Sequence, residues 1–211
     1  MDPKAISEQI NKSWLLRLCY SRTPGEVCYY AIPLMLLMFG VGIYGTRNLW
    51  LCLGLFAIGP IYWSAIEYVV HRFFFHWTPK SEKLYAAIYR IHKHHHDLPN
   101  DYTILNAGPF FGIPMAALWY GITALLVGSF WIAAPLVGGA VLGYLFYEWV
   151  HYEAHAGSHK AGWMGYLKRY HLTHHFIAHG ACFGVTSPLW DKVFRTELKP
   201  KRSSEKSAIS A

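Results

Sequence analysis

Charged side chains are scarce in this chain of 211 residues: Lys, Arg, Asp and Glu make up 15% of it, against 54% hydrophobic residues. A soluble globular domain carries about 25% charged residues, so this composition excludes an ordinary water-soluble protein and indicates one embedded in a membrane. Cysteine pairs are also missing, because Cys19, Cys28, Cys52 and Cys182 show no CxxC spacing and no regular framework. The four cysteines are therefore interpreted as free thiols.

Several signatures of other protein classes are absent as well. The sequence has no internal repeat, no glycine-rich phosphate loop and no Ser-His-Asp signature. Its first 26 residues include Asp2, Glu8 and Glu26 but no long apolar core, unlike a cleaved signal peptide. Membrane insertion is therefore expected to depend on the first transmembrane segment itself.

Two apolar runs follow this N-terminal segment. Val27–Tyr44 and Leu49–Ile66 contain no charge, and each approaches the ~20 apolar residues that cross a bilayer as a helix. They predict transmembrane helices over about 27–44 and 49–70. The connector between them is a short turn, so the helices are antiparallel and the chain leaves the membrane on the side where it entered.

A longer charge-free run extends from Tyr102 to Tyr147. As one helix it would span about twice the ~30 Å apolar thickness of a bilayer. A break near Gly128 therefore predicts a third helix over about 108–127 and a fourth over about 131–150. Prolines stand near the starts of both, where a helix tolerates them best.

The predicted fold is all-α and polytopic, with four transmembrane helices in two hairpins and a helical cap outside the bilayer. Helices outside the bilayer core are expected at Ser81–His96 and Trp163–His175. A cytosolic segment 1–26, a single membrane domain 27–196 and a disordered tail 197–211 are the expected divisions of the chain.

The formal charge of +7 would suit a protein that binds nucleic acid or an anionic surface. In the predicted topology, however, only Arg47 lies on the far side, and the other 18 of the 19 Lys and Arg residues lie on the near side. Cytoplasmic flanks collect Lys and Arg, so both termini and the cap are expected in the cytosol. Orientation thus explains the charge, and no nucleic-acid partner is expected.

Ten of the 13 histidines form four clusters on that same side. These are His71 and His76; His92, His95 and His96; His151 and His155; and His171, His174 and His175. Because i, i+3 and i+4 share a helix face, the three members of each larger cluster are expected to converge. His71 and His76 are five residues apart in the sequence, a spacing that favours contact with two separate ions. Ten imidazoles exceed the capacity of one first-row ion, so two ions are predicted, their identity left open between iron, zinc, copper and nickel. The cytosolic helical cap is thus expected to hold a histidine-rich dimetal site.

The histidine motifs continue into their flanking residues. Glu67 precedes His71 by one turn, Pro99 and Asp101 follow His96, Tyr170 precedes His171, and the stretch Phe183–Thr196 includes Asp191. Together, from about Ile66 to Thr196, these motifs resemble the fatty acid hydroxylase and sterol desaturase superfamily, and within it most closely the fatty acid 2-hydroxylases.

This resemblance implies a membrane non-haem di-iron enzyme that uses O2 to hydroxylate a lipid acyl chain, with the ten histidines as ligands of two iron ions. Zinc is expected to substitute during purification. The chain shows no cytochrome b5-like haem domain, so a separate electron-transfer protein, cytochrome b5-like or ferredoxin-like, is expected as a partner beside the membrane lipid or fatty acyl substrate. A bacterial inner membrane is favoured, with the endoplasmic reticulum as the other location.

Four carboxylates are expected to accept the second ring N–H of a ligand histidine or, for the last two, to cap helices or turns: Glu67, Glu148, Asp101 and Asp191. The remaining histidines, His94, His159 and His179, are expected to be non-ligands.

Other functions stay open. Within the superfamily they are a desaturase and a carotenoid, sterol or lipid-headgroup hydroxylase. Outside it, a metal transporter or storage protein is disfavoured, because transport requires polar sites near mid-membrane and these histidines gather at helix exits and beyond.

Overall fold

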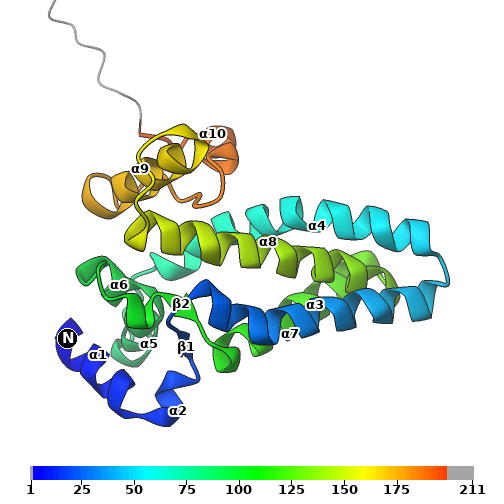
Figure 1. Ribbon diagram of the computed structural model, residues 1–211, viewed down its shortest axis with the longest axis horizontal. Helices are drawn as coiled ribbons and strands as arrows, with labels where there is room; N and C mark the ends of the chain where they lie inside the picture. The colour runs from blue at the N-terminus through cyan, green and yellow to red at the C-terminus, as the bar shows by residue number, and fades with distance from the viewer. Residues whose placement is uncertain (1, 199–211) are drawn as a thin grey trace, which may run out of the picture.

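A computed structural model describes residues 2–198, and four long helices run side by side in it (Figure 1). They are α3 (Pro24–Thr46), α4 (Leu49–Val69), α7 (Pro109–Val127) and α8 (Phe130–Ala156). Each is long and apolar enough to cross a membrane, α4 together with the π-helical turn η1 (Val70–Phe75) that continues it. The all-α membrane fold is confirmed; the described residues depart from it in one pair of two-residue strands, β1 (Tyr20–Ser21) and β2 (Asn106–Ala107).

Polar caps fix where the long helices begin and turn. The side chains of Thr23, Asn48 and Ser129 accept hydrogen bonds from backbone N–H groups in the first turns of α3, α4 and α8. Arg47 and Gly128 end α3 and α7 in the left-handed conformation, with φ of 54° and 70°. The predicted turn after 44 and the break near Gly128 are therefore both present.

Helix α8 is the centre of the bundle. Half of its apolar window is buried, against 11–17% for the other three long helices. Helices α3 and α4 pack mainly on α8 rather than on each other. Two glycines lie at the contact between α4 and α8: a Cβ atom on Gly59 would lie 2.2 Å from the Gly139 carbonyl carbon, and one on Gly139 would lie 2.0 Å from the Phe56 carbonyl oxygen. Small residues of this kind let transmembrane helices meet backbone to backbone.

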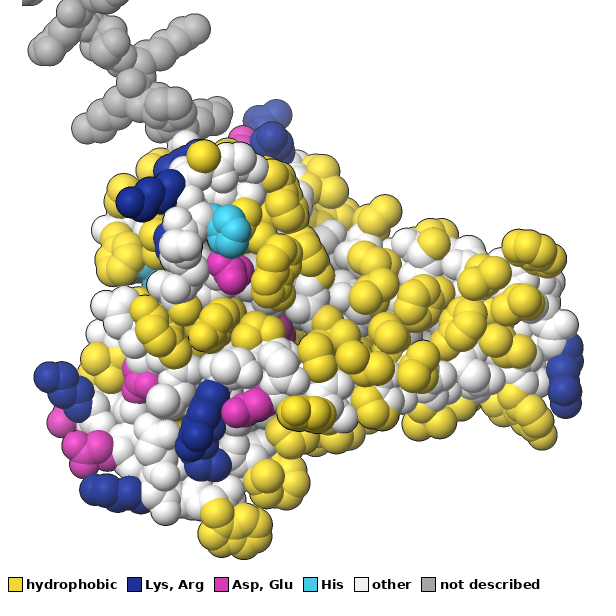
Figure 2. All heavy atoms as spheres, viewed as in Figure 1, with side chains coloured by type: hydrophobic (Ala, Val, Ile, Leu, Met, Phe, Trp, Pro, Cys, Tyr) yellow, Lys and Arg dark blue, Asp and Glu magenta, His cyan; other side chains and the backbone are white. Residues whose placement is uncertain are grey.

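The remaining elements form a cap at one end of the bundle, and charged side chains gather there while hydrophobic ones cover the elongated part (Figure 2). The cap consists of α1 (Pro3–Lys12), α2 (Trp14–Arg17), α5 (Glu82–Ile88), π-helical η2 (Tyr89–Lys93), α6 (His94–Asp97), η3 (Tyr102–Ile104), α9 (Gly162–Phe176) and α10 (Leu189–Phe194). Ile6 and Ile10 of α1 are buried against Tyr89 and Ile104. The N-terminal segment therefore shares a core with the rest of the cap.

The helices extend beyond the predicted membrane spans. Helix α4 ends at Val69, close to the predicted 70, and π-helical η1 continues it to Phe75. Helix α8 continues past the predicted span to Ala156, and His71 and His151 are buried where the sequence becomes polar. The predicted helix Ser81–His96 consists of α5, η2 and α6, and the predicted helix Trp163–His175 corresponds to α9. The predicted disordered tail, 197–211, lies outside the described residues apart from Glu197 and Leu198.

The glycine contact predicts that Gly139→Ala forces α4 and α8 apart and destabilises the bundle by about 1–3 kcal/mol. Thermal unfolding of the detergent-solubilised protein measures this. Gly54→Ala is the control, because no atom lies within 4 Å of a Cβ at that position. Equal melting temperatures for the two variants would contradict the glycine-mediated packing.

Candidate metal centre

The ten clustered histidines meet where the cap joins α4 and α8. Their ring nitrogens form two groups of five, each with its atoms within 4.8 Å of one another. The first group contains His71, His76, His92, His96 and His174; the second contains His95, His151, His155, His171 and His175. Within residues 2–198, His94, His159 and His179 belong to neither group.

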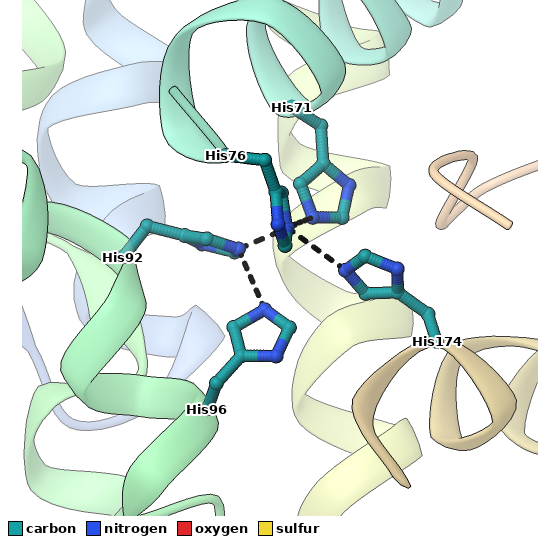
Figure 3. A group of neighbouring side chains, drawn as sticks. All are labelled: His71, His76, His92, His96 and His174. Carbon is teal, nitrogen blue, oxygen red and sulfur yellow. Dashed lines mark hydrogen bonds between the residues drawn. The ribbon is translucent and has the colours of Figure 1, made fainter. Parts of the chain in front are cut away.

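In the first group the rings point toward a common centre from three parts of the chain (Figure 3). The Nε2 atom of His71 lies 3.1 Å from that of His92 and 3.3 Å from that of His76. His92 and His96 are 2.9 Å apart, and His174 and His76 are 3.0 Å apart, again between Nε2 atoms. Histidines that are distant in sequence thus point their Nε2 atoms at the same small space.

His71 and His76 belong to the same group, so the prediction that they contact separate ions was wrong. The reason is the π-helical geometry of η1 and its end, where the His76 N–H donates to the His71 carbonyl at 3.3 Å. An i→i+5 turn brings residues five apart onto one face, whereas an α-helix would rotate them away from each other. A π-bulge of this kind is frequent at functional sites.

The second group is built at the end of α8. The Nε2 atom of His95 lies 3.2 Å from that of His151 and 3.1 Å from that of His155, and His155 and His171 are 3.0 Å apart. His175 completes the group, and among residues 2–198 neither of its ring nitrogens has a hydrogen-bond partner.

Each cluster of three histidines is divided between the two groups, contrary to the expected convergence. His92 and His96 join the first group and His95 the second, while His171 and His175 join the second and His174 the first. Adjacent residues point about 100° apart around a helix, so neighbours such as His174 and His175 face different centres. Because of this division, α6 and α9 each contribute histidines to both groups.

The imidazoles are neutral at neutral pH. Burial, with the nearby His174 ring as the next cause, lowers the pKa of His76 to about 3, and burial lowers the pKa of His174 to about 4. Burial also holds the pKa of His92, His95 and His171 well below the usual value. Neutral imidazole is the form that binds metal.

Backbone carbonyls fix the tautomer of two rings. His71 donates from Nδ1 to the Phe183 carbonyl at 2.5 Å, and His174 donates from Nδ1 to the Ala181 carbonyl at 2.8 Å. A carbonyl oxygen only accepts, so the proton of each neutral ring is on Nδ1 and Nε2 carries a bare lone pair. These lone pairs point into the first group, toward the Nε2 atoms of neighbouring rings, in the orientation that a metal ion requires.

The donor sets fit two transition-metal ions. At a metal–nitrogen distance of about 2.1 Å, ligands at right angles are about 3.0 Å apart, which matches the observed Nε2 separations. The nitrogen-only set suits iron and zinc alike and does not select between them.

The four carboxylates expected to accept from ligand rings accept from other donors instead. Glu67 accepts from the backbone N–H groups of Val185 at 2.5 Å and Thr186 at 3.0 Å. Asp191 accepts from those of Phe183 at 3.0 Å and Gly184 at 2.7 Å. Together they hold the loop 183–186, whose Phe183 carbonyl orients His71, so their effect on the ligand passes through the backbone.

Glu148 and Asp101 have different partners again. Glu148 accepts from the side chain of Asn106 at 2.6 Å and from the Ala107 N–H at 3.3 Å, which fastens β2 to α8. Asp101 caps η3 through the Thr103 N–H at 3.1 Å, the other role expected for it. The carbonyls of Ala181 and Phe183 were missed as ring partners, because a backbone oxygen leaves no signal in the sequence.

The three remaining histidines have separate environments. His94 is fully buried, with Nδ1 3.2 Å from the Tyr89 carbonyl. The Nδ1 atom of His159 lies 2.8 Å from Glu153 at the surface. The ring of His179 lies 5.7 Å from that of His96.

A cavity of about 430 Å³ adjoins both groups. His71 and His92 of the first group and His95 and His151 of the second are in its wall. The rest of the wall is mainly apolar and extends into the membrane-spanning part of α4, α7 and α8. Arg90 is the single Lys or Arg that lines it within the described residues.

The chain is similar in sequence to known hydroxylases. Residues 56–196 match the model of the fatty acid hydroxylase family. The chain is 36% identical over 172 residues to a ceramide very long chain fatty acid hydroxylase of Saccharomyces cerevisiae, covering 80% of this chain and 44% of the relative. A dihydroceramide fatty acyl 2-hydroxylase of Arabidopsis thaliana is 38% identical over 152 residues, which cover 72% of this chain and 63% of the relative.

A solved structure of full-length Scs7p, in which only the hydroxylase domain is visible, has a TM-score of 0.78 and 33% identity. The match covers 90% of this chain and 72% of that chain. The chain spans less than half the length of the yeast relative and under two thirds of the plant one.

Removing two ligands from one group should release one ion and leave the other. His92→Ala/His96→Ala is expected to lower bound zinc from two ions per chain to one, and His171→Ala/His175→Ala should do the same through the second group. Elemental analysis of the purified protein measures the ratio, with His159→Ala as the control that keeps both ions. Loss of both ions from each double variant would show a single shared site instead.

Glu67→Ala should weaken metal binding in the first group alone. It leaves the buried Val185 and Thr186 N–H groups without an acceptor, which costs about 1–3 kcal/mol for each, and frees the loop that orients His71. Loss of an outer partner of a ligand typically lowers metal affinity about 10–100-fold. Chelator competition resolves the two ions, and the exposed Glu82→Ala is the control; unchanged affinity at both sites would exclude this role.

Proposed function

Because the chain belongs to the fatty acid hydroxylase family, we propose that it is an O2-dependent di-iron enzyme that hydroxylates a lipid acyl chain, at the carbon next to the carbonyl. Its relatives named as fatty acyl 2-hydroxylases support that position. The proposed substrate is a membrane lipid or fatty acid, and the proposed cofactors are two iron ions, one in each five-histidine group.

One observation carries the proposal: a mainly apolar cavity has histidines of both groups in its wall. His71 and His95, one from each group, line the same space as Met115 and Val141 from the membrane-spanning helices. An acyl chain in this space would reach both groups without leaving an apolar environment. A metal transporter or store would need no such space beside its ligands.

The residues of the chain supply binding and orientation. Two iron ions held by the ten histidines would supply the activation of O2 that an unactivated C–H bond requires. The cavity wall excludes water and holds the acyl chain close to the ligands, and this fixed approach lowers the entropic cost of reaction. The Phe183 and Ala181 carbonyls keep His71 and His174 in the tautomer that presents Nε2.

Reduction of the irons requires electrons, for which we propose a separate cytochrome b5-like or ferredoxin-like protein. The protein is an integral membrane protein with four spanning helices. We propose that the cap and both termini face the cytosol, where such donors are found, in a bacterial inner membrane or the endoplasmic reticulum. The excess of Lys and Arg outside the α3–α4 link supports this orientation.

Expression in a host that lacks 2-hydroxylated lipids tests the function. Mass spectrometry of the host lipids should reveal acyl chains heavier by one oxygen, and His95→Ala should abolish them while His159→Ala keeps them. The proposal would be wrong if the host lipids stayed unchanged when the protein was loaded with iron and a reducing partner was supplied.

A further inference from the structure

The membrane-embedded part of the cavity occupies the space between α4 and α7, over the surface of α8. Both α4 and α7 pack on α8, and all three contribute to the wall. On α8 the lining residues recur every three or four positions from Val137 to His151, which is the pattern of one continuous helix face. At 1.5 Å per residue this face is about 21 Å long.

The deep end of this space is bridged by side chains. The hydroxyls of Tyr62 on α4 and Thr123 on α7 are 2.8 Å apart, and the Thr123 hydroxyl donates to the Trp119 carbonyl at 2.6 Å. Tyr62 and Trp119 line the cavity, whereas Thr123 is buried behind them and does not. Trp119 is also the last residue of α7 in the wall.

We infer that Tyr62, held by its bond to Thr123, and Trp119 close the membrane end of the cavity and set the longest acyl chain that the enzyme accepts. This inference rests on the proposed function in one respect: the ligand in the cavity is taken to be an acyl chain. A chain whose reacting carbon lies at the histidines extends along α8 until its end meets the Trp119 ring. Longer acyl chains must displace the Trp119 and Tyr62 side chains. Shorter acyl chains leave part of the apolar cavity wall uncovered.

The hydrogen bond between Tyr62 and Thr123 is stabilised by its apolar surroundings. Tyr62 and Thr123 pair two hydroxyls inside the membrane-spanning region, where an unpaired one is costly. The bond restrains the Tyr62 ring, while Thr123 is tied in turn to the backbone of α7. The end of the cavity is therefore stiffer than a wall of aliphatic side chains would be.

Two substitutions on α7 should move the length preference in opposite directions. Trp119→Ala opens the deep end, so the preferred chain becomes longer. Ala116→Leu, one turn nearer the start of α7, fills the cavity and shortens the preferred chain. For a fatty acid taken up from water, each added methylene that finds apolar surroundings strengthens binding about fourfold, so two carbons change the preference about tenfold or more.

Matched controls lie beside both positions. Leu118 is 54% exposed and Ala117 is also exposed, and neither lines the cavity. Leu118→Ala and Ala117→Leu make similar changes on the outward face of α7 and should keep the wild-type preference. Trp119→Phe keeps an aromatic ring and covers the case in which Trp119→Ala fails to fold.

Two assays applied to the same variants test the inference. The first supplies a host with a mixture of saturated fatty acids of graded length and measures the hydroxylated fraction of each. The second measures how strongly each fatty acid raises the melting temperature of the purified, zinc-loaded protein. Longer preferred chains for Trp119→Ala or Trp119→Phe, and shorter ones for Ala116→Leu, are the expected result in both.

An unchanged length profile in folded Trp119 and Ala116 variants, or an equal shift in the two controls, would overturn the inference. If the wild-type protein oxidises no acyl lipid, the proposed function fails, and the melting series still decides where the cavity ends.

Discussion

The structure depends on ten neutral imidazoles, seven of them buried and three half-buried, whose nitrogens face one another. In the first group, His71 and His174 have their protons fixed on Nδ1 by backbone carbonyls, so their Nε2 lone pairs point inward. Burial and neighbouring rings oppose protonation there, as the lowered pKa of His76 at about 3 shows. A metal ion in each group would satisfy such lone pairs without a proton, and four separate parts of the chain converge to present them.

Helix α8 connects this requirement to the membrane. Its end supplies His151 and His155 to the second group, its centre packs against α3 and α4, and one of its faces lines the cavity. The same rigid element thus fixes the ligands and the proposed acyl site relative to each other. Because helices rather than loops support them, the ligands and the proposed acyl site keep a fixed distance from each other, which the proposed reaction requires.

The four spanning helices and the ten clustered histidines were predictable from sequence, because lipid excludes charge and the motifs stand out against an apolar background. Three features were not. The π-helical turn at His71–His76 depends on a local backbone choice that the α-helical periodicity does not show. Helix geometry separates His95 from His96, but the partners that each ring meets, His151 and His155 for His95 and His92 for His96, depend on the tertiary packing. The partners of Glu67 and Asp191 are backbone N–H groups of a loop, which carry no side-chain signature.

The most direct test of the central claim is isotopic. A host that expresses the protein is grown under ¹⁸O2, and the 2-hydroxy acyl chains of its lipids are analysed by mass spectrometry. If the ten histidines hold two ions that activate O2 beside the cavity, the new hydroxyl oxygen carries ¹⁸O. A hydroxyl oxygen derived from water, or an oxygen at a position remote from the carbonyl, would contradict it.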